Sequence, residues 1–157
     1  MKIQLLLMDC DGVLTDGRLY FSSRGEEMKV FDVRDGQGIV LWHRAGFKSG
    51  IISGRGASEI INRRAEELGI AFVRTSSPDK VRDLEAIVDE LGLAMNEVAF
   101  IGDDIGDIDV MKRVGFAVAV ADAVDETKAV AAYVTTAKGG RGAVREVVDM
   151  LLAKHAE

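Results

Sequence analysis

Cysteine is almost absent from this sequence. The single Cys10 excludes a disulfide framework and a zinc site built from several cysteines, and it fits a reducing compartment. Positive charge is also scarce, because 20 lysines and arginines stand against 26 aspartates and glutamates and leave a net charge of -6. A chain this acidic has no general attraction for nucleic acid or anionic lipid, so an anionic ligand needs a local cluster of positive charge.

Long apolar runs are missing as well. No run approaches the roughly 18–20 residues that cross a membrane. The first residues also lack the length and the cleavage-site composition of a signal peptide. We therefore expect a cytoplasmic protein with no membrane partner and no nucleic-acid partner.

The sequence does contain enough apolar residues for a core, 48% of 157 residues, which predicts one domain over residues 1–157. Four apolar runs of strand length are nearly continuous, as in strands covered on both faces: residues 3–8, 48–52, 98–101 and 116–120. Between them, apolar residues recur with a helical period, most clearly in residues 81–91 and 144–152. Alternating strands and helices predict an α/β fold with a Rossmann-like parallel sheet flanked by helices.

The stretch after the first predicted strand departs from this rhythm. Apolar residues 19–21 and 28–33 flank a polar turn at residues 22–27, which predicts a small β-hairpin inserted at about residues 18–33. Farther along the chain, Ser77-Pro78 predicts a helix with Ser77 as its N-cap and the proline in its first turn.

Two aspartates, Asp9 and Asp11, follow the first predicted strand. Ligands of parallel α/β sheets bind at the carboxyl ends of the strands, and residues two apart in extended chain share a face. We therefore expect both carboxylates in one pocket, where they repel unless a cation lies between them or one holds a proton. This pattern favours a metal-bound nucleophile beside a general acid/base. The alternative is that Asp11-Gly12 is only a turn and that Asp9 caps a loop or a helix.

A second acidic cluster follows residues 98–101, with four aspartates between positions 103 and 109. Asp104 as an N-cap and Asp107 in the first turn of a helix would account for two of them. Asp103, at the end of the strand, remains, and its oxygens suit a hard cation, most simply Mg²⁺. A purely structural role for the cluster stays open.

Two further signals are weaker when taken singly. Ser53-Gly54-Arg55 places a hydroxyl and flexible backbone N–H groups at the end of another strand, where they could bind an oxyanion, although a serine there commonly caps a helix. Lys80 falls in the first turn of a predicted helix, where a cation opposes the helix dipole and therefore suggests an anionic partner. The alternative is a solvated surface lysine.

The order of these signals resembles that of the haloacid dehalogenase superfamily of phosphohydrolases. Its four signatures correspond to residues 9–17, Ser53, Lys80 and residues 102–107. The resemblance implies that Asp9 attacks phosphorus and forms an aspartyl-phosphate. It also implies that Asp11 protonates the leaving alcohol and then deprotonates the attacking water.

The resemblance further implies a Mg²⁺ site. The ion would bind the Asp9 carboxylate, the Asp11 backbone carbonyl, Asp103 and the phosphoryl group, which offsets the repulsion between nucleophile and substrate. Asp104 and Asp107 would orient the water ligands of the metal and Lys80.

The expected substrate contacts also follow from the resemblance. Ser53, with the flexible backbone of Gly54, and Lys80 would hold phosphoryl oxygens. A carboxylate on the substrate would need a cation in an otherwise acidic chain. The candidates for that cation are Arg55, Arg141 and Arg145.

Such sites are usually screened by a cap domain inserted after the first or the third signature. Residues 12–48 hold only a predicted hairpin and one helix, and residues 81–97 hold one helix, so the chain resembles the small capless branch. Within that branch it resembles the family of 3-deoxy-D-manno-octulosonate 8-phosphate (KDO 8-phosphate) phosphatases. The stretches typical of this family are residues 11–17, 31–36, 53–55 and 139–146. Other members of the branch act on nine-carbon sugar-acid phosphates of the KDN or sialic acid 9-phosphate type, which remain alternative substrates.

A capless site is open to water, and a hairpin exposes strand edges that solitary monomers seldom tolerate. The resemblance therefore implies a homotetramer in which a neighbouring subunit covers each active site. A non-enzymatic phospho-acceptor domain is a rival hypothesis, because receiver domains also combine aspartates, a hydroxyl and a lysine. In receiver domains, however, the acidic pair follows the first strand and the phosphorylated aspartate the third, and this order does not match.

Overall fold

A six-stranded parallel sheet forms the centre of the structure, a computed structural model that describes residues 2–157 with only the backbone at residue 27. The strands are β1 (Leu5–Met8), β4 (Lys48–Ile52), β5 (Phe72–Arg74), β6 (Val98–Gly102), β7 (Phe116–Ala119) and β8 (Tyr133–Val134). Their order across the sheet is β5-β4-β1-β6-β7-β8, and every neighbouring pair is parallel. The predicted α/β class is confirmed, and the four apolar runs correspond to β1, β4, β6 and β7.

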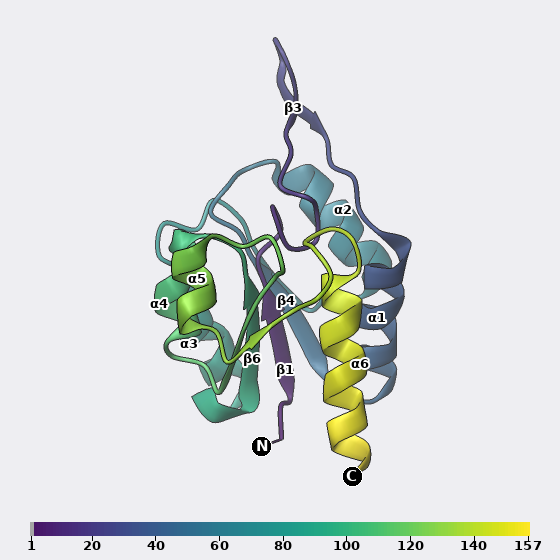
Figure 1. Cartoon of the computed structure of the whole chain (residues 1–157). Coiled ribbons are helices and arrows are strands. Elements are labelled where there is room, and N and C mark those ends of the chain that lie inside the picture. The colour runs from purple at the N-terminus through teal and green to yellow at the C-terminus, as the bar shows by residue number, and fades with distance from the viewer. Residues whose placement is uncertain (1) are drawn as a thin grey trace.

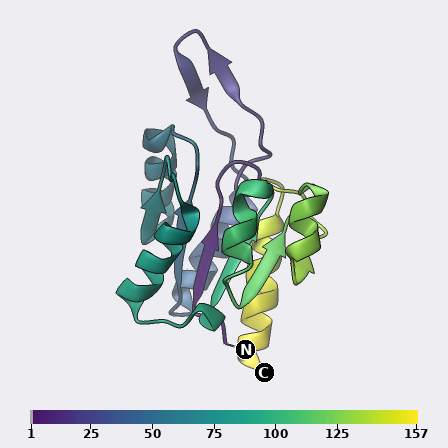
Figure 2. The same cartoon turned by 90° about the vertical axis from the view of Figure 1, so that its left-hand side faces the viewer.

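Helices cover both faces of this sheet (Figures 1 and 2). The helices are α1 (Val33–Arg44), α2 (Ser58–Leu68), α3 (Lys80–Leu91), α4 (Ile108–Met111), α5 (Asp125–Val130) and α6 (Ala143–Ala156). In Figure 1, α1, α2 and α6 lie on one side of the strands, and α3, α4 and α5 lie on the other. Two short 3-10 turns, η1 (Met95–Glu97) and η2 (Ile105–Asp107), flank β6. Within residues 2–157, no helix is both long and apolar enough to cross a lipid bilayer.

The helical stripes predicted from the sequence face the sheet. Helix α3 buries Leu84, Ile87 and Val88, whose transfer from water contributes roughly 1.5–3 kcal/mol for each side chain. Helix α6 buries Val144, Val147, Val148 and Leu151 in the same way. All four residues of β1 are buried, as expected for a strand in the middle of a sheet with helices on both faces.

The predicted start of α3 was wrong by two residues. The helix begins at Lys80, with Asp79 as its N-cap, and the Asp79 carboxylate accepts a hydrogen bond from the Arg82 N–H at 3.1 Å. The Ser77 hydroxyl instead donates to Asp83, while the Ser77 N–H donates to the Ser53 carbonyl. Ser77 is therefore tied to the loop after β4, which leaves the capping position to the aspartate.

The hairpin insertion is present, and its second strand differs from the prediction. It consists of β2 (Tyr20–Ser22) and β3 (Gly25–Met28), not of arms at residues 19–21 and 28–33. Ser22 pairs with Gly25, so only two residues form the turn, and Gly25 adopts a φ of 101° that suits glycine. The chain must also leave the strand early because Asp32 caps α1 by accepting the Arg34 N–H. The hairpin projects beyond the carboxyl end of the sheet (Figures 1 and 2).

The strand order positions the functional site. Chain connections run outward from β1 through β4 to β5, and then from β6 through β7 to β8 on the other side. The direction of winding therefore reverses between β1 and β6, and ligands of open α/β sheets bind at the carboxyl ends of the strands at such a reversal. The hairpin, inserted after β1, stands over the same end.

Candidate active site

Asp9 lies immediately after β1, at the reversal point. Its N–H donates to the Ile101 carbonyl on β6, so the sheet fixes its backbone. One carboxylate oxygen, Oδ1, accepts the Cys10 N–H at 2.7 Å, and the other, Oδ2, lies 2.9 Å from Lys80 Nζ. The residue is only 8% exposed, so its carboxylate is aimed into an enclosed space.

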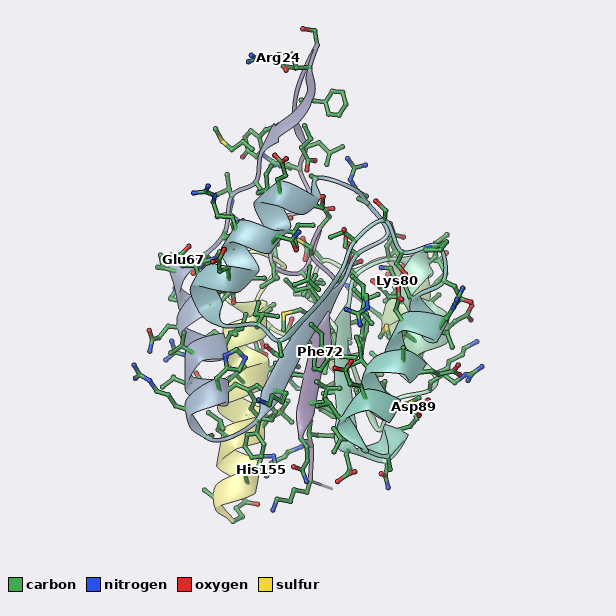
Figure 3. The ribbon with its side chains drawn as sticks, turned by 180° about the vertical axis from the view of Figure 1, so that it is seen from behind. Arg24, Glu67, Phe72, Lys80, Asp89 and His155 are labelled. Atoms are coloured by element: carbon green, nitrogen blue, oxygen red, sulfur yellow. The ribbon has the colours of Figure 1, made fainter. Side chains whose placement is uncertain are left out.

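Lys80 connects two carboxylates that lie in the segments after two different strands, Asp9 after β1 and Asp107 after β6. Its position at the first residue of α3 brings Nζ to 2.9 Å from Asp9 and 2.8 Å from Asp107 Oδ1. Burial alone would lower the pKa of Lys80, but the neighbouring Asp9 and Asp107 carboxylates raise it overall, so the lysine stays charged. Figure 3 shows Lys80 at the end of α3 nearer the hairpin, with His155 at the opposite end of the molecule. The lysine is therefore an internal counter-ion and not the solvated surface residue of the alternative reading.

Asp107 is a fully buried organiser of the loop after β6. Its second oxygen, Oδ2, accepts the Asp103 N–H at 3.0 Å and the Asp104 N–H at 3.4 Å. Asp104 caps η2, where its carboxylate accepts the Ile105 N–H at 2.7 Å, as the capping interpretation of the sequence predicted. Gly102 leaves room for this arrangement, because a Cβ there would lie 2.7 Å from the Asp107 Cβ.

Asp103 carries a buried carboxylate with no cation paired to it among the described residues. Its Oδ1 is buried and finds no hydrogen-bond donor among the described residues. Asp9, Asp103 and Asp107 each offer an oxygen within 4.8 Å of the others. Burial, followed by the charges of Asp9 and Asp107, raises the pKa of Asp103 to about 8. Burial, followed by the charge of Asp107, raises the pKa of Asp9 to about 7.

This oxygen cluster fits a hard divalent cation. Carboxylates crowded into a buried space are stabilised by a positive ion, and Mg²⁺ prefers oxygen ligands of this kind. Gly12 makes the approach possible, since a Cβ at this residue would lie 1.9 Å from Asp103 Oδ2. Its φ of 86° is also one that residues with a side chain rarely adopt.

Asp11 lies on the other side of the same pocket, and its partners come from outside the sheet. Lys29 Nζ, just after β3, approaches Asp11 Oδ1 at 2.6 Å, and Arg55 Nε lies 3.5 Å from Oδ2. Glu26, on β3, is a further neighbour of both cations. Neither Lys29 nor Glu26 carries a signal in the sequence, because no spacing rule connects a hairpin charge with a residue on another element.

Ser53 and Gly54 follow β4 and line the same pocket as Asp9. Ser53 is almost fully buried, its N–H donates to the Arg74 carbonyl, and its hydroxyl accepts the Arg55 N–H at 3.3 Å. Gly54 lies against the Lys80 side chain, with 3.7 Å between the position of a Cβ and the Lys80 Cε. The strand ends therefore converge on one pocket of about 410 Å³.

The three candidate arginines are not equivalent. Arg55 lines the pocket. Arg145 faces along α6, where its Nε donates to both Asp149 oxygens at 3.0 Å, and Arg141 is exposed in the loop before α6. The structure brings Arg55 to the other site residues and leaves Arg141 and Arg145 outside the pocket lining.

The glycine-rich stretch before α6 packs against the loop after β1 that carries Asp9 and Asp11. Gly139 and Gly140 pack directly on the loop after β1, because a Cβ on Gly139 would lie 1.7 Å from the Gly12 carbonyl oxygen. Asp35 of α1 accepts the Gly142 and Arg145 N–H groups and so holds the start of α6. Three of the stretches typical of the resembled family, residues 11–17, 31–36 and 139–146, are therefore in contact.

The chain matches a known family and known structures. Residues 57–147 match the haloacid dehalogenase-like hydrolase family. The chain is 44% identical over 151 residues to the 3-deoxy-D-manno-octulosonate 8-phosphate phosphatase KdsC of Escherichia coli (strain K12). The matched residues make up 96% of this chain and 80% of that protein.

Solved structures agree with this likeness. The crystal structure of 3-deoxy-D-manno-octulosonate 8-phosphate phosphatase from Moraxella catarrhalis, in complex with magnesium, phosphate and KDO, is 39% identical with a TM-score of 0.92, covering 96% of this chain and 86% of that one. The cobalt-bound phosphatase (YrbI) from Haemophilus influenzae is 35% identical with a TM-score of 0.95, covering 99% of this chain and 90% of that one.

Proposed function

The chain belongs to the haloacid dehalogenase-like hydrolases and, within them, to the 3-deoxy-D-manno-octulosonate 8-phosphate phosphatase family, and we propose on this premise that it hydrolyses 3-deoxy-D-manno-octulosonate 8-phosphate. The products are the free sugar acid and inorganic phosphate. The observation that carries the proposal is the pairing of Asp9 with Lys80 in a pocket that Asp11 and Asp103 also line.

Asp9 is the nucleophile of the first half-reaction. A carboxylate oxygen of Asp9 bonds to phosphorus while the bond between phosphorus and the ester oxygen breaks. The leaving oxygen takes the proton of Asp11, which supplies the general acid. The burial of Asp9 and its fixed backbone support this role, since a nucleophile must be held in line with the bond that breaks.

Asp11 reverses its role in the second half-reaction. Its carboxylate takes a proton from a water molecule whose oxygen bonds to phosphorus. The bond between phosphorus and the Asp9 oxygen breaks, phosphate leaves, and Asp11 is protonated again for the next cycle. Asp11 lines the pocket two residues from Asp9, and this position supports its access to the leaving ester oxygen and to the oxygen of the attacking water.

We assign Asp9, the Asp11 backbone carbonyl and Asp103 as the protein ligands of Mg²⁺, with Asp104 and Asp107 orienting its surroundings. Bound Mg²⁺ would withdraw negative charge from the phosphoryl group and the nucleophile. The buried, unpartnered Asp103 oxygen and the raised pKa values of Asp9 and Asp103 support the assignment. Asp107 also fixes Lys80, which keeps one cation next to the phosphoryl position.

The remaining pocket residues recognise the substrate. Ser53, the Gly54 backbone and Lys80 bind phosphoryl oxygens. Arg55 binds the carboxylate at the far end of the sugar acid, because it is the arginine that lines the pocket. Its side chain is 48% exposed, which leaves its guanidinium accessible to a ligand. Arg141 and Arg145 are weaker candidates for this contact, given their positions outside the lining.

The assembly we propose is a homotetramer in the cytoplasm, with a neighbouring subunit covering each site. Large apolar side chains on and beside the hairpin are exposed to solvent, and such clusters mark protein contacts. They are Leu19, Tyr20, Phe21, Met28, Val30 and Val33. Light scattering is expected to give the mass of four chains for the wild type and a smaller mass for Phe21→Glu. An active wild-type monomer would contradict this arrangement.

The function is tested by phosphate release from purified protein. We expect release from 3-deoxy-D-manno-octulosonate 8-phosphate in Mg²⁺, loss of release in EDTA, and recovery when Mg²⁺ is returned. A panel with KDN 9-phosphate and sialic acid 9-phosphate identifies the preferred sugar acid. A higher kcat/KM for a nine-carbon ester would change the assigned substrate and leave the proposed mechanism standing. No phosphate release from any of these esters would reject both the substrate and the mechanism.

A further inference from the structure

A closed ring of four alternating charges lies on the hairpin side of the pocket. Lys29 Nζ contacts Asp11 Oδ1 at 2.6 Å and Glu26 Oε1 at 2.5 Å. Arg55 completes the ring, with Nε at 3.5 Å from Asp11 Oδ2 and Nη2 at 3.4 Å from Glu26 Oε2. Each carboxylate therefore places one oxygen on each cation. The ring joins three segments, namely the loop after β1, the hairpin and the loop after β4.

The ring is enclosed most tightly at Lys29. The side chains of Lys29 and Glu26 are 2% and 6% exposed, against 14% for Asp11 and 48% for Arg55. Burial alone would lower the pKa of Lys29, but its hydrogen bonds with Asp11 and Glu26 raise it overall. A buried ammonium that keeps its charge holds its partners firmly, because losing one of them leaves an uncompensated charge.

The two oxygens of Asp11 are not equivalent within this ring. Oδ1 is engaged by Lys29 at hydrogen-bond distance. Oδ2 makes no hydrogen bond within the part of the chain that the structure describes, and its ring partner, Arg55 Nε, lies 3.5 Å away, beyond ordinary hydrogen-bond distance. A general acid needs one oxygen free to carry the proton and a side chain fixed toward the leaving atom. Asp11 meets both requirements only if Oδ1 is the oxygen that is held.

We propose that Lys29 is a positioning residue for Asp11, holding Oδ1 so that Oδ2 faces the leaving oxygen, and that Glu26 keeps Lys29 and Arg55 in place. The inference rests on the proposed function, since it concerns how the proton of that reaction is delivered. Lys29 acts through Asp11. The hairpin then contributes to catalysis as well as to any assembly, because Lys29, just after its second strand, orients the general acid/base Asp11.

Leaving-group dependence separates this role from a structural one. For an enzyme with a covalent intermediate, kcat/KM reports the steps up to departure of the leaving group. An alkyl phosphate needs a proton on its leaving oxygen, whereas p-nitrophenyl phosphate hardly does. We expect Lys29→Met to lower kcat/KM for a simple alkyl phosphate by about 100-fold, the size of effect that misplacing a reacting group produces. The loss with p-nitrophenyl phosphate should be far smaller.

Matched variants complete the experiment. Lys29→Arg keeps the cation and should recover most of the loss. Lys112→Met, at the exposed residue that caps the C-terminus of α4, should change the activity on neither ester. Asp11→Asn should show the same ester dependence as Lys29→Met, with a larger size. If Lys29→Met does not fold, Glu26→Gln carries the test, because it weakens the hold on Lys29 with little change in shape.

Equal losses on both esters, or no loss on either, would overturn the positioning role. Both esters lack the sugar-acid carboxylate, so this result does not depend on which substrate is natural. A wild-type protein that releases phosphate neither from these esters nor from 3-deoxy-D-manno-octulosonate 8-phosphate would instead overturn the proposed function, and the inference with it. Light scattering on each variant shows whether assembly is retained, which separates proton delivery from subunit contacts.

Discussion

Asp9 and Asp11 are only two residues apart, and they lie in two different environments. Asp9 belongs to the sheet: its N–H bonds to β6, and its carboxylate is paired with Lys80 at the start of α3. Asp11 belongs to the insertion: its partners are Lys29 beside the hairpin and Arg55 in the loop after β4. In the proposed mechanism the rigid core positions the group that forms a bond, while a surface insertion positions the group that moves a proton.

The largest loss of activity is expected from a change at Asp9. Asp9→Asn keeps the shape of the side chain and removes the nucleophilic carboxylate, so turnover should fall by about 10,000-fold or more on every ester. Stopped assays of phosphate release with the alkyl ester and with p-nitrophenyl phosphate measure the loss. Thermal unfolding of the same sample provides the control for folding. Retained activity in a folded variant would remove Asp9 from the mechanism.

Asp11→Asn tests the other half and should have a smaller, ester-dependent effect. General acid catalysis contributes about 100- to 10,000-fold, so kcat/KM for an alkyl phosphate should fall within this range. The effect on p-nitrophenyl phosphate should be much weaker at the level of kcat/KM. If Asp9→Asn and Asp11→Asn gave the same pattern across esters, the division of labour between the two aspartates would fail.

The crowded carboxylates of Asp9 and Asp103 predict that the stability of the metal-free protein depends on pH. In the metal-free protein the pKa values of Asp9 and Asp103 are raised to about 7 and about 8. A carboxyl with a raised pKa in the folded state contributes stability that is fully present below its unfolded pKa and is lost as pH rises through the folded value. The metal-free protein should therefore lose stability between about pH 4 and pH 8, and Mg²⁺ should restore it mainly at the upper end.

Calorimetry with and without Mg²⁺ measures this dependence. A ligand at 100 times its Kd stabilises the folded state by about 2.7 kcal/mol, so a Tm increase of roughly 5–10 °C is expected at about pH 8.5. At about pH 5 the increase should nearly vanish, because protons compete with the metal for Asp9 and Asp103. In Asp103→Asn the increase at high pH should shrink, while the Arg141→Ala control should behave as the wild type. An increase that is independent of pH would argue against these ligands.

The smallest expected effect concerns Arg55. A charged hydrogen bond to the sugar-acid carboxylate contributes roughly 1.5–3 kcal/mol, so Arg55→Ala should raise KM for the sugar-acid phosphate by about ten- to a hundred-fold. A sugar phosphate of similar size without a carboxylate separates this contact from the influence of Arg55 on Asp11. Arg141→Ala and Arg145→Ala, outside the pocket lining, serve as matched controls. Equal KM changes for both sugars would show that Arg55 does not recognise the carboxylate.

The four central strands and the Asp9 half of the site were predictable from the sequence, whereas the short edge strands β5 and β8 were not among the predicted apolar runs. Continuous apolar runs predict strands covered on both faces, and the carboxyl ends of parallel strands must meet at one edge. The proximity of Asp9, Ser53, Lys80 and Asp103 follows from that topology, because each comes directly after a strand or begins the next helix.

The hairpin half was not predictable in the same way. Its register depends on a two-residue turn closed by Gly25 and on the Asp32 cap, and an alternation of apolar residues does not distinguish these from a longer turn. Lys29 and Glu26 meet Asp11 only after the hairpin folds back, so no local spacing reports their contact. Arg145 looked suitable in sequence, but Asp149, one helical turn away, pairs with it.

The most direct test of the account is to identify the residue that carries the phosphoryl group. Wild-type protein is mixed with p-nitrophenyl phosphate and Mg²⁺, quenched in acid during turnover, digested and examined by mass spectrometry. The account predicts a phosphoryl group on the peptide at Asp9, more of it in Asp11→Asn, where the second half-reaction is slowed, and none in Asp9→Asn. Phosphate release with an unmodified Asp9 peptide, or a phosphoryl group on another residue, would contradict it.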